Sequence, residues 1–160
     1  MQIIEGDILQ VFDKAKEAYL LHGVSCQPVL HAGLAKQLIN KYPALLTQHR
    51  KNIQLLGADM LLGTCTFFAT DTTGHKTKDI VNLYQQRDVG VGKQQIDYDY
   101  FESALQDFRK NLTDGLYALP VYMPYGIGAG LGGGDWSVIE KIIKRVLPKT
   151  ILVRYEKKRS

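Results

Sequence analysis

The sequence predicts a layered α/β protein of one domain. Apolar residues come in short bursts rich in β-branched and aromatic side chains, and amphipathic stretches lie between these bursts. This alternation is expected of strands interleaved with helices. The length of 160 residues suits one domain, and 45% hydrophobic with 22% charged residues is ordinary for a chain that folds. Because no internal repeat or Pro- or Ser-rich linker divides the chain, we expect a single domain over residues 1–156 and a basic tail over residues 157–160.

Six strands are predicted, each bounded by Gly, Pro, Asp or Lys. The second of them is almost continuously apolar, which suits a central strand that is covered on both faces. The predicted strands are residues 1–4, 18–24, 62–69, 79–84, 115–121 and 150–155.

Three helices are predicted between these strands. Residues 32–41 form the first, and two others follow from apolar side chains that recur at helical spacing, so that each helix can lay one face on the sheet. Asp135 stands where the last helix needs an N-cap, and Pro148 marks its other end. The recurring side chains are Tyr98, Phe101, Leu105 and Phe108 in one helix and Trp136, Ile139, Ile143 and Val146 in the other.

The charge of the chain favours a small phosphate-rich ligand over a nucleic acid. The formal net charge is +4, but Lys157, Lys158 and Arg159 supply three of these charges, so the rest of the chain is almost neutral. A basic stripe with interleaved aromatic residues is absent, and nucleic acid is therefore not an expected partner. A modest positive field still suits a phosphorylated small molecule.

Cysteine spacing and hydropathy predict a cytoplasmic protein without a metal. Cys26 and Cys65 lack the spacing of a zinc site, and no run of His and Cys supplies a ligand set. We therefore expect no metal and no cofactor. The chain opens with a strand pattern instead of a secretion signal, and no apolar run is long enough to span a membrane, so we expect a cytoplasmic location and no membrane partner.

The densest functional signal is a glycine-rich segment at residues 123–136, between a predicted strand and a helix. Its six glycines let backbone N–H groups turn toward an anion, and the following helix adds a partial positive charge. A diphosphate needs such a site. No lysine follows the glycines, which disfavours an NTPase, and the late position disfavours a dinucleotide dehydrogenase. A turn without a ligand is the structural alternative.

A second candidate anion site follows the second strand. Ala32 and Gly33 open a helix with small residues, which permits close approach of a phosphate or ribose. His22 ends the strand and is a candidate general acid or base, with a structural histidine as the alternative. His31 lies in the loop itself, where it either reaches a ligand or is a solvent-facing residue without a function. Cys26 is a weak candidate nucleophile because no partner base is evident.

Other polar residues are predicted at the carboxyl edge of the sheet, where open α/β folds bind ligands. Asp7 follows the first strand and either accepts a hydrogen bond from a ligand amine or caps the next helix. Asn82, Gln85 or Gln86 lies at the same edge, with a surface turn as the alternative, and we select Asn82 and Gln86 as candidate ligand contacts. The two remaining histidines, His49 and His75, are predicted to be surface residues.

Taken together, these segments resemble those that form the ligand site of macro domains. The Gly6-Asp7-Ile8 turn, residues 22–35 and the Gly128-Ala129-Gly130-Leu131 run before Trp136 occur in the same chain order, and the resemblance spans nearly the whole chain. It is closest to the branch that includes terminal ADP-ribose protein glycohydrolase, the yeast-type ADP-ribose 1''-phosphate phosphatase, and phage or bacterial proteins of similar length. The resemblance implies a three-layer α/β/α sandwich with a mixed, about six-stranded sheet.

The resemblance also implies ADP-ribose or ADP-ribose 1''-phosphate as ligand, and ADP-ribosylated macromolecules as a further class of partner. Each contact is assigned to the residue of this chain that stands at the matching position of the family's motif. By this analogy Asp7 binds the adenine amine, Ile8 offers its backbone, Ala32 and Gly33 line the distal ribose and diphosphate, Gly128, Ala129, Gly130, Leu131 and Gly132 wrap the phosphates, and Tyr155 flanks the adenine.

For catalysis, the resemblance favours the phosphatase. That pattern places a histidine at the end of the second strand, as His22 is here, and an acid in the late loop, for which Asp135 is the candidate. The glycohydrolase pattern instead has a lysine where this chain has Gln85 and Gln86, and an aspartate where it has Gly132. We therefore expect hydrolysis of ADP-ribose 1''-phosphate by His22 and Asp135. Removal of ADP-ribose from macromolecules and non-catalytic ADP-ribose binding are the alternatives.

Overall fold

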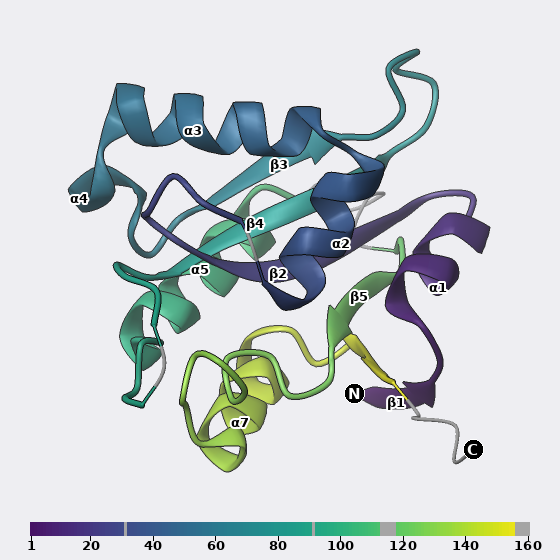
Figure 1. Ribbon diagram of the computed structural model, residues 1–160. Coiled ribbons are helices and arrows are strands. Elements are labelled where there is room, and N and C mark those ends of the chain that lie inside the picture. Colours follow the sequence, from purple (N-terminus) through teal and green to yellow (C-terminus); the bar gives the residue numbers. More distant parts are fainter. Residues whose placement is uncertain (31, 91, 113–117, 156–160) are drawn as a thin grey trace, which may run out of the picture.

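The computed structural model describes residues 1–30, 32–90, 92–112 and 118–155 (Figure 1). His31, the basic tail at residues 157–160 and residues 115–117 of the fifth predicted strand lie outside the described residues.

A single six-stranded sheet forms the centre of the molecule. Its strand order is β1-β6-β5-β2-β4-β3, and all neighbouring pairs are parallel except β3 with β4. The predicted mixed sheet is therefore confirmed. The strands are β1 (Gln2–Glu5), β2 (Ala18–Ser25), β3 (Cys65–Ala69), β4 (Lys78–Gln86), β5 (Val121–Pro124) and β6 (Ile151–Arg154).

Helices cover both faces of this sheet and complete the predicted α/β/α layers (Figure 1). Alternate residues of the buried strand β2 point to opposite faces, so Leu20 packs with one helical layer and Leu21 with the other. One layer holds α1 (Ile8–Lys14), α2 (Gly33–Lys41) and α3 (Ala44–Leu56), followed by the short α4 (Ala58–Leu61), and the other holds α5 (Tyr98–Lys110) and α7 (Trp136–Val146).

The strand predicted at residues 115–121 is misplaced, because β5 begins only at Val121. Residues 118–120 precede it as a turn that ends in Pro120, whose carbonyl accepts a hydrogen bond from the N–H of Tyr19. Pairing then continues along Tyr122 and Met123 against β6. The apolar run therefore extends into the segment that the sequence analysis assigned to the glycine-rich loop.

The strand predicted at residues 62–69 starts late, at Cys65. A turn occupies the preceding residues, where the backbone N–H and the hydroxyl of Thr64 both donate to the carbonyl of Leu61, at 2.9 and 2.7 Å. Gly63 takes the left-handed φ of +79° that this turn needs. The turn still bonds to β4, since the Gly63 N–H donates to the Tyr84 carbonyl at 2.9 Å and the Thr64 carbonyl accepts from the Tyr84 N–H at 3.0 Å. The regular strand begins only after it, at Cys65.

None of the described helices is both long and apolar enough to cross a bilayer.

Candidate functional site

A cavity of about 600 Å³ lies at the carboxyl ends of β2, β4 and β5. Four segments line it: the end of β2, the loop and first turn leading into α2, the end of β4 with the residues after it, and the glycine-rich loop after β5. Of the predicted site residues, His22, Ala32, Gly33, Gln86 and the loop residues Gly128, Gly130, Leu131 and Gly132 line this cavity. The fold therefore brings together the two candidate anion sites that lie far apart in the sequence.

A second hollow of about 810 Å³ is larger, but no residue of β2, β4 or β5 lines it. It is an open groove between α5, α7 and the turn at Gly63, and it is lined by charged side chains such as Glu102, Arg109 and Arg145. No predicted site residue lines it. We therefore place the candidate site in the cavity at the strand ends.

The glycine-rich loop is folded tightly against itself. Gly134 N–H donates to the carbonyl of Gly128 at 2.8 Å. A Cβ at Gly132 would lie 2.7 Å from that same carbonyl oxygen, so this position admits only glycine without a rearrangement. The aspartate that the glycohydrolase pattern has here would not fit this loop conformation.

This loop offers the cavity several unused hydrogen-bond donors. The backbone N–H groups of Gly128, Gly130, Leu131 and Gly132 make no hydrogen bond with any other described residue. Free N–H groups on neighbouring residues that line one cavity form an anion-binding surface.

The start of α2 adds further free donors to the same cavity. Asp7, Asp97 and Asp135 cap α1, α5 and α7 with their carboxylates, but Ala32 at the N-cap of α2 has no side-chain acceptor. The first-turn N–H groups of α2 are thus without a capping side chain, and this turn lines the cavity. Together with the partial positive charge of a helix N-terminus, they favour a bound anion.

His22 is the polar centre of the cavity floor. It is only 2% exposed, and its Nε2 lies 2.6 Å from Oδ1 of Asn82, its partner in the ladder between β2 and β4. Burial lowers the pKa of His22 to about 4, against the opposing effect of the Asn82 hydrogen bond. The imidazole is therefore neutral at physiological pH. Asn82 itself is buried beside His22 and does not line the cavity, and its Nδ2 has no partner among the described residues.

The prediction that His49 is a surface residue was wrong. Its side chain is fully buried between α3 and the sheet, where its ring stacks on Tyr84. Nε2 donates to the carbonyl of Gln27 at 2.8 Å, and because that nitrogen carries the proton, Nδ1 accepts from the Tyr84 hydroxyl at 3.1 Å. His49 thus anchors the loop that leads to the cavity. His75 is exposed, as predicted.

Gln85 is a cavity residue that was not among the contacts predicted from the sequence. It is 3% exposed, and its side-chain amide lies against Gly23 of β2, where a Cβ would stand 2.2 Å from Cδ of Gln85. Its Oε1 is buried without a hydrogen-bond partner in the described part of the chain. Gly23 interrupts the apolar run of β2. This glycine was the sequence signal that a side chain from the neighbouring strand β4 packs over β2 at that point. Gln86 also lines the cavity and donates from Nε2 to the carbonyl of Asp88 at 2.8 Å.

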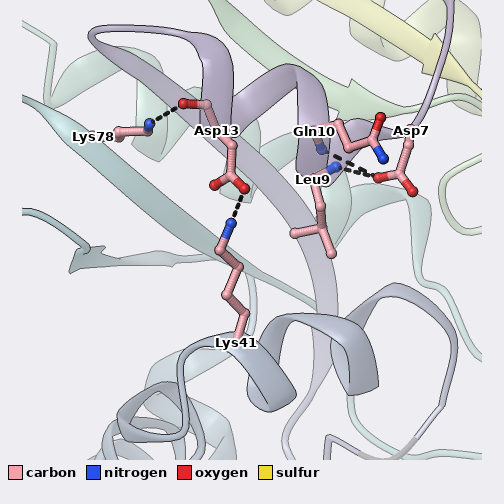
Figure 2. Close-up of polar contacts among 6 residues, drawn as sticks. All are labelled: Asp7, Leu9, Gln10, Asp13, Lys41 and Lys78. Atoms are coloured by element: carbon pink, nitrogen blue, oxygen red, sulfur yellow. Dashed lines mark hydrogen bonds and ion pairs between the residues drawn. The ribbon is translucent and has the colours of Figure 1, made fainter.

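Asp7 caps α1, as its structural alternative predicted. Its Oδ1 accepts from the N–H groups of Leu9 and Gln10 at 2.9 and 3.3 Å (Figure 2). The other oxygen, Oδ2, has no hydrogen-bond partner among the described residues and stays available to a ligand donor. Figure 2 also shows Asp13 of the same helix, which pairs with Lys41 and accepts from Lys78 through its carbonyl.

The capping alternative also accounts for the observed contacts of Asp135. Its Oδ1 accepts from the backbone N–H and the hydroxyl of Ser137 at 2.9 and 2.8 Å. The hydroxyl bond, followed by the backbone bond, lowers the pKa of Asp135, so the group is an ionised carboxylate at neutral pH. Its catalytic role stays a prediction. Like Asp135, the predicted contacts Asp7, Ile8, Ala129 and Tyr155 do not line the cavity.

The two cysteines have the properties of packing residues. Cys26 is buried and Cys65 is partly buried, and burial raises the pKa of each thiol. Neither lines the cavity. Within the described residues, no group of three or more His, Cys, Asp and Glu side chains is arranged to hold a metal ion.

Comparison with known proteins extends over almost the whole chain. No protein-family model matches it. An uncharacterized 17.5 kDa protein of Enterobacteria phage T4 is 28% identical over 153 residues, which cover 96% of this chain and 94% of that protein.

Solved structures are similar over the same extent. A protein of unknown function from Bacteroides thetaiotaomicron matches with a TM-score of 0.80 and 21% identity over 97% of each chain. The macrodomain of Mycobacterium tuberculosis DarG matches with a TM-score of 0.73 and 23% identity over 98% of this chain and 97% of that one. Thermosipho africanus DarTG in complex with ADP-ribose matches with a TM-score of 0.74 and 19% identity over 100% of this chain and 43% of that one. The chain therefore has the macrodomain fold.

Proposed function

We propose that the protein binds ADP-ribose in the cavity at the strand ends and hydrolyses ADP-ribose 1''-phosphate to ADP-ribose and phosphate. One observation supports ADP-ribose as the ligand: two sets of free backbone N–H groups, from the glycine-rich loop and from the first turn of α2, line the same cavity. No acidic side chain stands among the described residues that line the cavity, so a diphosphate meets donors without repulsion. The complex of Thermosipho africanus DarTG with ADP-ribose, a protein of the same fold, supports this ligand.

We orient the ligand along the strand order, with its adenine on the side where the resemblance assigns Asp7 to the adenine amine. Asp7 and Tyr155 follow β1 and β6, on one side of β5, whereas His22 and Gln86 belong to β2 and β4, on the other side. The adenine lies toward Asp7, whose free Oδ2 accepts from the adenine amine, and toward Ile8 and Tyr155. The diphosphate lies between Gly33 and the glycine-rich loop, which includes Ala129. The terminal ribose then lies over β2 and β4.

His22 supplies the base for the hydrolysis. Because Asn82 presents its amide oxygen to Nε2, that nitrogen carries the ring proton and Nδ1 keeps its lone pair. Nδ1 accepts a proton from the attacking water as the water oxygen bonds to phosphorus and the P–O bond to the ribose breaks. The proton then passes to the departing ribose oxygen. A neutral imidazole suits this role, and the charge of bound phosphate raises the pKa of His22 and makes it a stronger base.

The test combines turnover with binding. We expect the wild-type protein to release phosphate and ADP-ribose from ADP-ribose 1''-phosphate through many turnovers in the presence of a chelator, and to bind ADP-ribose in a calorimetric titration. His22→Ala should reduce kcat by about 10²- to 10⁴-fold and leave ADP-ribose binding nearly intact. His75→Ala, which removes an exposed histidine, is the matched control and should retain full turnover. Full turnover by His22→Ala would remove His22 from the mechanism.

A non-catalytic ADP-ribose-binding protein is the second candidate. Two observations favour it. The low pKa of His22, about 4, makes this histidine a weak base before phosphate binds, and Asp135 does not line the cavity. Binding of ADP-ribose without any release of phosphate from ADP-ribose 1''-phosphate would decide for it. Removal of ADP-ribose from macromolecules remains the third candidate, and assays with an ADP-ribosylated protein and an ADP-ribosylated nucleic acid test it.

A further inference from the structure

Gln85 brings one open acceptor to the floor of the cavity. Its backbone is fixed, because its carbonyl accepts from the N–H of Asp97 at 2.9 Å. Its side-chain Nε2 lies 3.4 Å from Oε1 of Gln86, so the donor end of the amide has a partner. The other end, Oε1, is buried and has no partner among the described residues.

Gly23 makes room for this amide, and Gly128 lies near its Nε2. A Cβ at Gly23 would lie 2.2 Å from Oε1 of Gln85, and a Cβ at Gly128 would lie 3.6 Å from its Nε2. The amide therefore sits between β2 and the glycine-rich loop, and all three residues line the cavity. A side chain in place of Gly23 would displace this amide.

A buried acceptor without a donor destabilises a folded protein, and such groups need an explanation. The described residues that line the cavity supply no donor to Oε1 of Gln85. A ligand that occupies the cavity can supply this donor. In the proposed direction of the ligand, the part over β2 and β4 is the terminal ribose, which carries hydroxyl groups.

We infer that Gln85 is a specificity-determining residue, whose Oε1 accepts a hydrogen bond from a hydroxyl of the terminal ribose. This inference rests on the proposed function, since it takes the ligand and its direction from there. Gln85 thus distinguishes ADP-ribose from ADP, which has the same adenosine and diphosphate but no terminal ribose.

The experiment measures Kd for ADP-ribose and for ADP by calorimetry and compares their ratio between variants. Wild-type protein should bind ADP-ribose more tightly than ADP. Gln85→Met keeps the length of the side chain and removes the acceptor, and should lower this preference by about fivefold to tenfold, almost entirely through weaker ADP-ribose binding. Gln85→Glu keeps the acceptor and adds a charge, and should weaken both ligands while the preference persists.

Gln48→Met is the matched control. Gln48 also has a buried Oε1 without a partner in the described residues, but it lies outside the cavity, where its Nε2 donates to the carbonyl of Phe67. This variant should keep the wild-type preference. A folded Gln85→Met protein with an unchanged preference would overturn the inference, and so would wild-type protein that binds both ligands equally. Wild-type protein that binds neither ligand would instead overturn the proposed function.

Discussion

At the scale of single residues, the site contains polar groups that the fold alone does not satisfy. Oε1 of Gln85 and Nδ2 of Asn82 are both buried without a partner among the described residues. Each such group costs about 1–3 kcal/mol when it is desolvated and unpaired. Groups that stay unpaired in this way lower the stability of the protein.

Gln85→Met should therefore stabilise the protein when no ligand is present. We expect its free energy of unfolding to rise by about 1 kcal/mol, because the variant replaces an unpaired acceptor by an apolar group of similar length. Urea denaturation of the ligand-free protein measures this change. Gln85→Met loses only the long 3.4 Å contact to Oε1 of Gln86, whereas Gln48→Met loses a 3.1 Å bond to the carbonyl of Phe67 and should show no such gain. A loss of stability in Gln85→Met would mean that Oε1 is satisfied in the empty protein.

Cavity residues that offer backbone N–H groups could be predicted from the sequence. Residues whose burial depends on tertiary packing could not. The glycine-rich loop and the Ala32–Gly33 start of α2 were predicted, because small residues between a strand and a helix leave backbone N–H groups open to a ligand. His49 was misjudged since it stands in a polar stretch, and only the helical spacing from Leu45 would have placed it on the buried face. Gln85 was left unselected because its burial depends on Gly23 of another strand.

At the scale of elements, the amphipathic helices were the most predictable. The predictions for α5 and α7 are confirmed, with Phe101, Leu105 and Phe108 buried in one and Ile139 and Ile143 in the other. The first and last residues of the strands were less predictable, since they depend on pairing with neighbouring strands. β5 begins at Val121, where it pairs with Tyr19 of β2, and not where the apolar run of the sequence begins. With only four residues, it is too short for an alternating pattern to mark its ends.

Asp135 offers a test that separates capping of α7 from catalysis. Asp135→Ala removes the acceptor for the Ser137 N–H and should lower Tm by a few degrees. Asp135→Asn can still cap the helix and should keep both Tm and turnover of ADP-ribose 1''-phosphate close to wild type. Thermal melting and the phosphate-release assay check the two variants together. Loss of turnover in Asp135→Asn with Tm unchanged would establish the predicted catalytic role.

At the scale of the whole molecule, the buried histidines couple folding to pH. The pKa of His22 falls from 6.5 to about 4 on burial, and burial also lowers the pKa of His49. Between these two values the unfolded chain binds the proton at His22 and the folded protein does not. The stabilisation from a neutral His22 is therefore complete above about pH 6.5 and is lost as the pH falls toward about 4.

This coupling predicts a pH dependence of stability that one substitution should reduce. Each unit of pKa shift corresponds to about 1.4 kcal/mol, so the wild-type protein should lose about 3 kcal/mol through His22 between about pH 7.5 and about pH 4. His22→Gln cannot take up this proton and should lose correspondingly less over the same range, whereas His75→Ala should follow the wild-type curve. Urea denaturation at a series of pH values measures the difference, in which the titration of the carboxylates common to all three proteins cancels. Parallel curves for wild type and His22→Gln would show that His22 takes up its proton in the folded protein at its ordinary pKa. A histidine with that pKa would act as a base in hydrolysis without help from bound phosphate.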